Sequence, residues 1–216
     1  MTDKELQQHV RNALDWEPSV DVADVGVTVD NGIVTLRGDI RSFAEKMTAE
    51  RVALGVYGVK AVANDLTVRI VQPGERTDSD IAAAAVNAFK WNSQVPADRI
   101  SVAVGNGWIT LKGEVDWNFQ RDAAVRAVRD LLGVVGVTNS ITVRPHVSVS
   151  DVKSKIEAAL RRSAEVDARR INVSTTDGRV VLTGNVHSWV ERREAVQAAW
   201  AAPGVSAVDD RLAIVP

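Results

Sequence analysis

Apolar and polar residues alternate along this chain in a pattern that recurs three times. In each copy an amphipathic helical stretch precedes two short alternating stretches, a second helical stretch and a last alternating one. The two middle stretches are separated by Asn-Gly at 31–32 and 106–107, and by Asp-Gly at 177–178. These dipeptides favour a two-residue β-hairpin turn, because both central residues of that turn need positive φ. The pattern therefore predicts a helix–strand–strand–helix–strand unit in triplicate.

The first helix of each unit is predicted from apolar residues that share one helical face. We expect it to begin with the capping box Thr2-x-x-Glu5 in the first unit, near Thr77 or Asp78 in the second, and at Ser148 in the third. The apolar residues that define its buried face are Leu6, Val10, Leu14, Ile81, Ala85, Ala88, Phe89, Val152, Ile156 and Leu160.

The second helix of each unit is alanine-rich, and small residues allow a helix to lie close to a sheet. Capping boxes are predicted at Ser42-x-x-Glu45 and Ser188-x-x-Glu191. We expect one glycine to close the preceding strand and another to end the helix, namely Gly38 and Gly58, Gly113 and Gly136, and Gly184 and Gly204. The interval between these glycines is 23 residues in the second unit against 20 in the others, which predicts a longer helix or an extra turn there.

These elements place the chain in the α+β class. We predict three tandem α-β-β-α-β units, each a three-stranded mixed sheet with two helices packed on one face, spanning residues 1–70, 77–144 and 148–216. The strand–helix–strand connection should be right-handed if its two strands are parallel. Units near 70 residues bury limited apolar surface, so docking between them would help.

Composition restricts the possible functions. The chain has 216 residues, a net charge of −2, 45% hydrophobic residues and no cysteine, so disulfides are excluded. The charge is not concentrated in a basic footprint, and no nucleic-acid partner is expected. Residues 1–10 lack the basic and apolar regions of a signal peptide, and no stretch approaches the roughly 20 apolar residues of a membrane span. The sequence therefore predicts a cytoplasmic location without a transmembrane segment.

Candidate chemistry is sparse. His9, His146 and His187 lie in three different contexts, and none has metal-ligand spacing to another His or to an acidic cluster. No serine or lysine stands in a nucleophile motif. We therefore predict that the protein is not an enzyme, with no catalytic residue, no metal ligand and no cofactor.

The repeated pattern resembles the BON domain family. The resemblance is carried by (N/D)-G-x-(V/I)-x-L-x-G-x-(V/I) at each hairpin and G-V-x-x-V-x-(N/D)-x-(L/I) at the last strand. The second motif is complete at residues 58–66 and 204–212, and it is interpreted as shortened at 136–141. The family is similar to modules that contact phospholipid surfaces or envelope assemblies. The resemblance therefore implies a non-catalytic protein linked to envelope or osmotic stress.

Aromatic and arginine residues supply a candidate contact surface. Six tryptophans beside one tyrosine is an unusual ratio. The candidates are Trp16 and Trp91 at the ends of first helices, Trp117, Phe119 and Trp189 near the starts of second helices, and Arg161, Arg162, Arg169, Arg170, Arg192 and Arg193 in the third unit. Packing within or between units and a solvated charged face are the simpler interpretations. The functional interpretation is contact with a partly hydrated interface, which suits the apolar ring and polar N–H of tryptophan.

Two hypotheses from different classes follow. In the first, the protein binds anionic phospholipid through the arginines and the aromatic residues, each basic residue contributing roughly 1 kcal/mol. In the second, it is a structural interaction protein that self-associates or presents docked units to a protein partner. A weaker third hypothesis is small-ion sensing, because BON units occur in potassium-binding proteins, but no ligand cluster in the sequence supports it.

Overall fold

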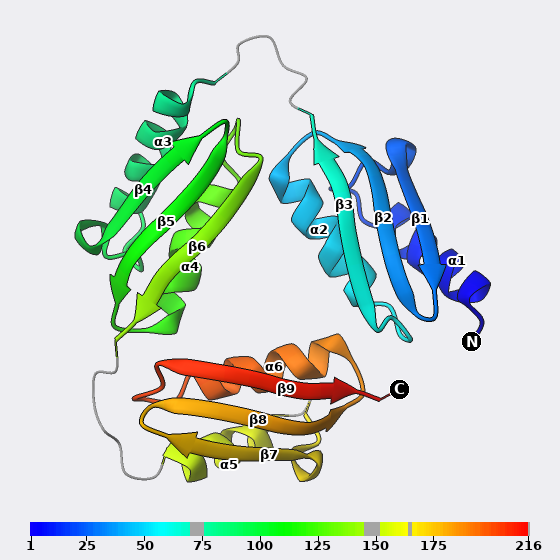
Figure 1. Cartoon of the computed structure of the whole chain (residues 1–216), viewed down its shortest axis with the longest axis vertical. Helices are drawn as coiled ribbons and strands as arrows, with labels where there is room; N and C mark the ends of the chain where they lie inside the picture. The colour runs from blue at the N-terminus through cyan, green and yellow to red at the C-terminus, as the bar shows by residue number, and fades with distance from the viewer. Residues whose placement is uncertain (70–75, 145–151, 164–165, 216) are drawn as a thin grey trace. The chain divides into compact units, whose positions relative to one another are not determined.

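The computed structural model describes residues 1–69, 76–144, 152–163 and 166–215. Across these residues the chain forms three separate three-stranded sheets, each accompanied by two α-helices (Figure 1). A helix, a short 3-10 turn, two strands, a second helix and a third strand follow one another in each unit. This order confirms the predicted α-β-β-α-β units and the α+β class.

The first unit has a mixed sheet whose middle strand is the second one. It consists of α1 (Asp3–Asp15), η1 (Val22–Asp24), β1 (Val25–Asp30), β2 (Ile33–Ile40), α2 (Phe43–Leu54) and β3 (Ala61–Val68). β2 pairs antiparallel with β1 and parallel with β3. Leu14 of α1, Ala53 of α2 and Leu36 of β2 belong to one buried cluster, so both helices cover the same face of the sheet. Ile70, which would extend the last strand, lies outside the described residues.

The third unit repeats this arrangement. It consists of α5 (Val152–Arg162), η3 (Ala168–Arg170), β7 (Ile171–Thr176), β8 (Arg179–Val186), α6 (Trp189–Trp200) and β9 (Ala207–Ile214). β8 pairs antiparallel with β7 and parallel with β9. Ile156, Leu160 and Leu182 form the centre of its core, and Trp200 packs against that core while partly buried. The predicted helix start at Ser148 lies outside the described residues.

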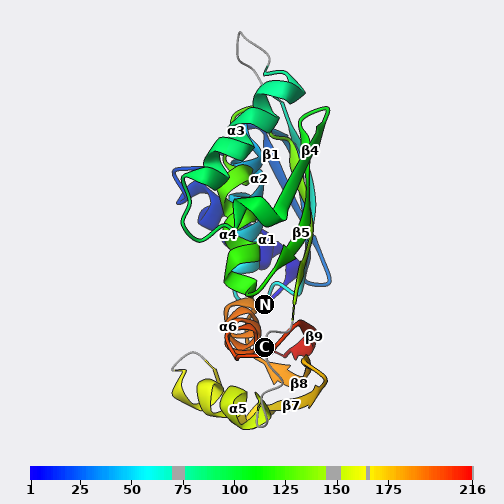
Figure 2. The ribbon, with the colours of Figure 1, turned by 90° about the vertical axis from the view of Figure 1, so that its left-hand side faces the viewer.

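The second unit also has three strands, with β5 in the middle. It consists of α3 (Asp78–Lys90), η2 (Ala97–Arg99), β4 (Ile100–Gly105), β5 (Trp108–Val115), α4 (Asn118–Arg129) and β6 (Gly136–Val143). Figure 2 shows α3 and α4 on the same side of β4 and β5. Thr77 caps α3, which agrees with the predicted start near Thr77 or Asp78, and it also forms a capping box with Asp80.

The glycine in the turn after α4 that matches Gly58 and Gly204 differs from the predicted one. α4 has 12 residues, as α2 and α6 do, so the prediction of a longer helix is wrong. Gly133 has φ 91°, which matches φ 94° at Gly58 and φ 86° at Gly204, whereas Gly136 begins β6. These glycines lie in the turn before the last strand and do not end the helices: α2 ends at Leu54 with Gly55 as its C-cap at φ −73°, and α4 ends at Arg129, so the prediction of a helix-ending glycine is wrong. Counted from Gly133 the interval is the same in all units, and the last-strand motif is complete at 133–141 rather than shortened.

The glycine inside the hairpin's second strand has a different role from the predicted one. Gly38 does not close β2, because the strand continues to Ile40. Its φ is 131°, and a Cβ atom there would lie 1.8 Å from the carbonyl oxygen of Asp24. Gly113 and Gly184 make the same close approach to the 3-10 turns of their own units. The glycine is therefore required by the contact between η1 and β2.

The residue predicted to complete each second-helix capping box has another role. The Ser42 hydroxyl accepts a hydrogen bond from the backbone N–H of Glu45, which is the expected half of the box. The Glu45 carboxylate, however, is buried and accepts from the backbone N–H groups of Asp21 at 2.7 Å and Arg41 at 2.8 Å. The prediction of a reciprocal box is therefore wrong, because the carboxylate connects two loops instead of returning to Ser42.

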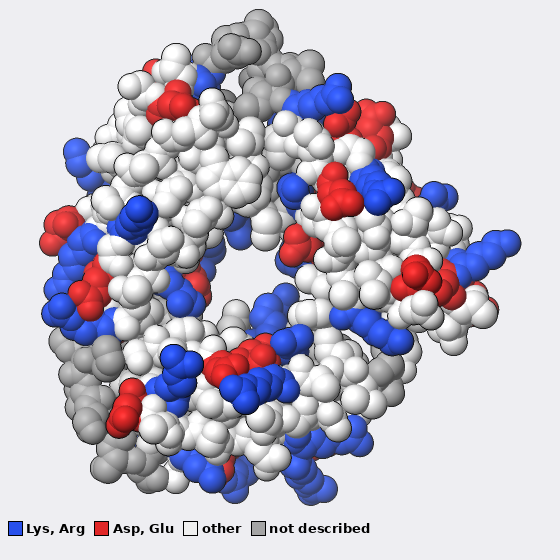
Figure 3. All heavy atoms as spheres, viewed as in Figure 1, with Lys and Arg blue, Asp and Glu red and all other residues white. Residues whose placement is uncertain are grey.

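The outer faces of the sheets carry charges of both signs. Figure 3 shows acidic and basic side chains next to one another over the faces in view. In the first unit Arg37 lies 3.4 Å from Asp65, and Arg69 lies 2.9 Å from Asp39. Such exposed pairs contribute little to stability, but they leave no single-signed field on these faces.

Candidate functional site

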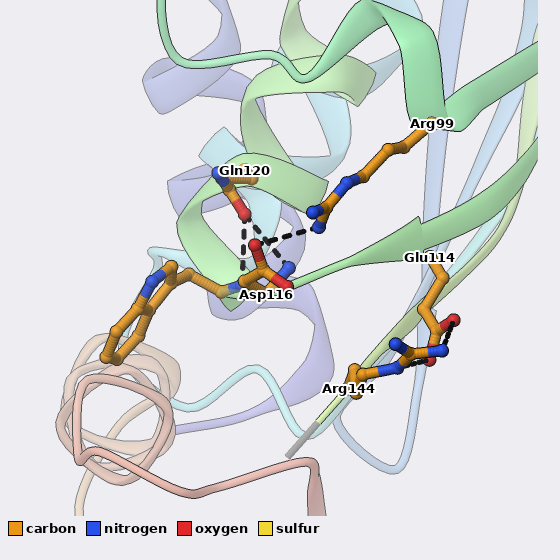
Figure 4. Close-up of polar contacts among 6 residues, drawn as sticks. Arg99, Glu114, Asp116, Gln120 and Arg144 are labelled. Carbon is orange, nitrogen blue, oxygen red and sulfur yellow. Dashed lines mark hydrogen bonds and ion pairs between the residues drawn. The ribbon is translucent and has the colours of Figure 1, made fainter. Parts of the chain in front are cut away.

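Gln120 and its surroundings show how the start of a second helix is held in place. Gln120 Oε1 accepts hydrogen bonds from the backbone N–H groups of Asp116 and Trp117, both at 3.1 Å (Figure 4). Arg99 contacts the Asp116 carboxylate at 2.8 Å, and Arg144 contacts Glu114 through two bonds of 2.8 and 2.9 Å. The segment before α4 is thereby fixed from both sides, and Trp117 and Phe119 are presented there 37% and 51% exposed.

The ends of the first helices carry the most exposed large hydrophobic side chains of the described chain. Trp16 caps α1 and is 90% exposed, and Trp91 caps α3 and is 91% exposed. Their backbone N–H groups donate to the carbonyl oxygens of Asn12 and Asn87 at 3.1 Å. The main chain is thereby fixed, while the indole ring projects into solvent. In the third unit the equivalent position is Arg162, the exposed last residue of α5. We call this position the helix-end corner, formed by Trp16, Trp91 and Arg162.

Two of the predicted arginines line one hollow beside the helix-end corner of the third unit. Arg161 of α5 and Arg169 of η3 line one hollow of about 580 Å³, whose other lining residues are Glu157, Leu160, Val166, Asp167, Ala168 and Ile171. Arg161 pairs with Glu157 at 3.5 Å, and Arg170 pairs with Asp167 at 3.5 Å. The four side chains of these two ion pairs are substantially exposed to solvent, so the pairs are weak and exchangeable.

Arg162 and Arg169 differ from Arg161 and Arg170 in their ion pairs. Neither side chain has an ion-pair partner among the residues that the structure describes. Both are exposed. Figure 3 shows basic side chains along the lower edge of the third unit in that view. The end of α5 and η3 therefore carries exposed cationic groups on the surface that the structure describes.

Arg192 and Trp189 are engaged inside their own unit. The Arg192 guanidinium lies 4.8 Å from the centroid of the Trp189 ring and 2.7 Å from the Asp210 carboxylate. Both side chains are partly buried, and the Trp189 indole nitrogen is buried without a hydrogen-bond partner in the structure as described. Arg193, by contrast, is exposed on α6. Arg192 and Trp189 are thus packed within their own unit, whereas the arginines near η3 are exposed.

Metal binding and membrane crossing find no support in the described residues. Across residues 1–69, 76–144, 152–163 and 166–215 there is no group of three or more His, Asp or Glu side chains placed to hold a metal ion. None of the helices in those ranges combines the length and the hydrophobicity that crossing a bilayer requires. His146 lies outside the described residues.

Comparison with known proteins supplies the family and several relatives. The BON domain model matches residues 2–70, 77–145 and 148–216. Osmotically-inducible protein Y of Escherichia coli (strain K12) is 30% identical over 149 residues, which cover 65% of this chain and 72% of that protein. Outer membrane lipoprotein DolP of Haemophilus influenzae is 27% identical over 139 residues, covering 61% and 72%. The 21 kDa hemolysin of Actinobacillus pleuropneumoniae is 29% identical over 135 residues, covering 61% and 69%.

These relatives contradict the predicted cytoplasmic location. One of them is an outer membrane lipoprotein, and it matches 61% of this chain. The prediction rested on the composition of residues 1–10 and on the lack of an apolar stretch of membrane-spanning length, and neither feature decides the location.

Proposed function

The chain belongs to the BON domain family, and on that premise we propose that it is a non-enzymatic protein of the bacterial envelope stress response that binds anionic phospholipid surfaces. The relatives support the cellular setting, since one is osmotically inducible and another is an outer membrane lipoprotein. The unit bounds 1–70, 77–144 and 148–216 are part of the same proposal.

The helix-end corner is the observation that carries this proposal. A tryptophan that is 90% or 91% exposed gains nothing from its own core, so its apolar surface is available to an external partner. An indole at the level of lipid headgroups buries its ring while its N–H stays wet. The same corner of the third unit presents Arg162, whose charge suits the anionic headgroup itself.

Charge near η3 supplies the second contribution. Each Arg close to an anionic membrane contributes about 1 kcal/mol, so Arg161, Arg162, Arg169 and Arg170 together contribute about 4 kcal/mol. This attraction is screened over about 8 Å at physiological ionic strength. Binding through these arginines is therefore weak, reversible and sensitive to salt.

A structural interaction role is the second candidate. The exposed Trp16 and Trp91 occupy equivalent positions in two units, and tryptophan is enriched in protein interfaces. Contacts dominated by these rings would survive high salt, whereas attraction to anionic lipid would not. Ionic strength therefore separates the two functions.

The test uses the full chain with vesicles of phosphatidylglycerol and phosphatidylcholine, against vesicles of phosphatidylcholine alone. The variant R162E/R169E reverses two exposed arginines at the end of α5 and in η3, and the control K153E/K155E reverses two exposed lysines of α5 with the same change in net charge. Co-sedimentation with the anionic vesicles should fall at least tenfold for R162E/R169E and much less for the control. Equal losses in the two variants, or binding of the unchanged protein that ignores salt, would contradict the lipid proposal.

A further inference from the structure

In two of the units, an aspartate at the start of the first helix accepts hydrogen bonds from the hairpin turn. The Asp3 carboxylate accepts hydrogen bonds from the backbone N–H groups of Asn31 at 2.7 Å and Gly32 at 3.0 Å. In the second unit Asp78 accepts from the corresponding groups at 106 and 107, both at 2.8 Å. One carboxylate therefore holds both amide protons of each Asn-Gly turn.

The same turns are held from the opposite side by a backbone bond. The Gly32 carbonyl accepts from the Lys60 N–H at 2.9 Å, and the Gly107 carbonyl accepts from the Val135 N–H at 3.0 Å. Both glycines are buried, whereas the asparagine before each is exposed. The Asn side chain is thus open to water while the peptide that follows it is fixed.

Asn-Gly is the dipeptide in which a side-chain amide most readily reacts with its own main chain. The glycine nitrogen loses its proton and attacks Cγ of the asparagine, a new C–N bond forms, and ammonia leaves. Water then opens the cyclic imide to aspartate or isoaspartate. The attack needs a free amide nitrogen that can rotate toward Cγ. In this protein a carboxylate binds that N–H, its negative charge opposes loss of the proton, and the carbonyl bond opposes the rotation.

We propose that Asn31 and Asn106 are latent deamidation sites that Asp3 and Asp78 protect, and that deamidation at Asn31 weakens the turn that the first helix holds. The Asn31 side-chain amide donates a hydrogen bond to the Asp30 carboxylate at 2.9 Å, so a carboxylate created at position 31 would lose that bond and lie beside Asp30. Two like charges that lie so close repel each other. Deamidation would therefore replace a hydrogen bond within the turn by a repulsion.

The third unit provides an internal comparison. Its turn begins with Asp177, which has φ 48° like the 51° of Asn31. In the repeat alignment the position of Asp3 and Asp78 is taken by Val149, which lies outside the described residues. The sequence thus has asparagine in the turn where the aligned helix position is aspartate, and aspartate in the turn where that position is valine.

The test follows deamidation of the full chain during incubation at mildly alkaline pH, by peptide mass and isoaspartate content at each asparagine. Loss of hydrogen bonds to a charged acceptor removes roughly 1.5 kcal/mol or more, so D3A should accelerate reaction at Asn31 about tenfold or more. The rate at Asn106 should not change in D3A. D78A should show the reverse pattern, so that each variant serves as the control for the other.

A second set of measurements distinguishes protection by the aspartate from the general effect of folding on the deamidation rate. L14A weakens the core of the first unit without touching the turn, and it should accelerate Asn31 far less than D3A does. In the unchanged protein both sites should react more slowly when folded than in denaturant. N31D should destabilise the first unit, and the effect should shrink in a D30N background. Equal acceleration by L14A and D3A, or equal rates in folded and unfolded protein, would overturn the proposal.

Discussion

The carboxylate of Glu45 reaches across 24 residues and accepts the backbone N–H of Asp21 at 2.7 Å. Its second oxygen accepts from Arg41 at 2.8 Å, and Glu191 makes the equivalent bond to Asp167 at 2.8 Å in the third unit. One buried side chain thereby joins the loop after the first helix to the junction before the second. This connection positions the helix ends that carry the exposed residues of the candidate surface.

Removing this carboxylate should loosen the first unit. E45A leaves two N–H groups without their acceptor, and we expect the free energy of unfolding of that unit to fall by roughly 2–4 kcal/mol. E45Q should cost about 1 kcal/mol, because an amide oxygen can still accept, as Gln120 does in the second unit. Hydrogen exchange of the Asp21 and Arg41 amides measures the effect. E191A is the matched control, since it should leave those two amides unchanged.

Glycine 38 should tolerate no side chain. In G38A the new Cβ would meet the Asp24 carbonyl oxygen at 1.8 Å, in a backbone with φ 131°. Strain of this kind costs roughly 1–3 kcal/mol before the clash is counted, so we expect a loss of at least that size in urea unfolding. G26A is the control from the neighbouring strand, where the nearest atom is 3.6 Å away and φ is not positive. Similar stabilities of the two variants would refute the close-approach explanation.

The exposed tryptophans should affect binding without affecting folding. W16A/W91A removes two side chains that are about nine-tenths exposed, so its unfolding free energy should stay within about 0.5 kcal/mol of the unchanged protein. Its affinity for anionic vesicles should fall several-fold, because the interfacial contact of the indoles is lost. Vesicle titration and urea unfolding of the same preparation provide both readouts. Unchanged vesicle binding would remove these residues from the contact surface.

Acid should loosen the starts of α1 and α3. Hydrogen bonds from the Thr2 backbone and hydroxyl lower the pKa of Glu5, and those from the Thr77 hydroxyl and backbone lower the pKa of Asp80. A carboxyl with a lower pKa in the folded state stabilises the fold at pH values above its unfolded pKa, which is about 4. That contribution is lost as the pH falls through the lower folded value.

Carboxyl titration by NMR tests this origin of the shifts. In T77V the hydroxyl of the cap is removed, so the pKa of Asp80 should rise toward the ordinary aspartate value. The pKa of Glu5 should not move in that variant, since its partner is Thr2. A T77V protein in which Asp80 titrates as before would assign the lowered pKa to another cause.

The local parts of the fold were decided by the sequence alone. Asn31 and Gly32 have φ 51° and 81°, as the dipeptide predicted, because the steric preference for positive φ belongs to those two residues. The apolar spacing of Leu6, Val10 and Leu14 likewise predicted a buried face that the structure confirms. Three copies of one pattern then indicated three units and the BON resemblance.

Tertiary structure decided what depends on partners distant in the chain. The role of Gly38 follows from a carbonyl at residue 24, and the role of Glu45 follows from an amide at residue 21, neither of which local periodicity can show. The choice of Gly133 over Gly136 depended on backbone φ, because both glycines precede a valine. The surroundings of the arginines were decided the same way, since the fold places Arg161 and Arg169 at one hollow and directs Arg192 to Asp210.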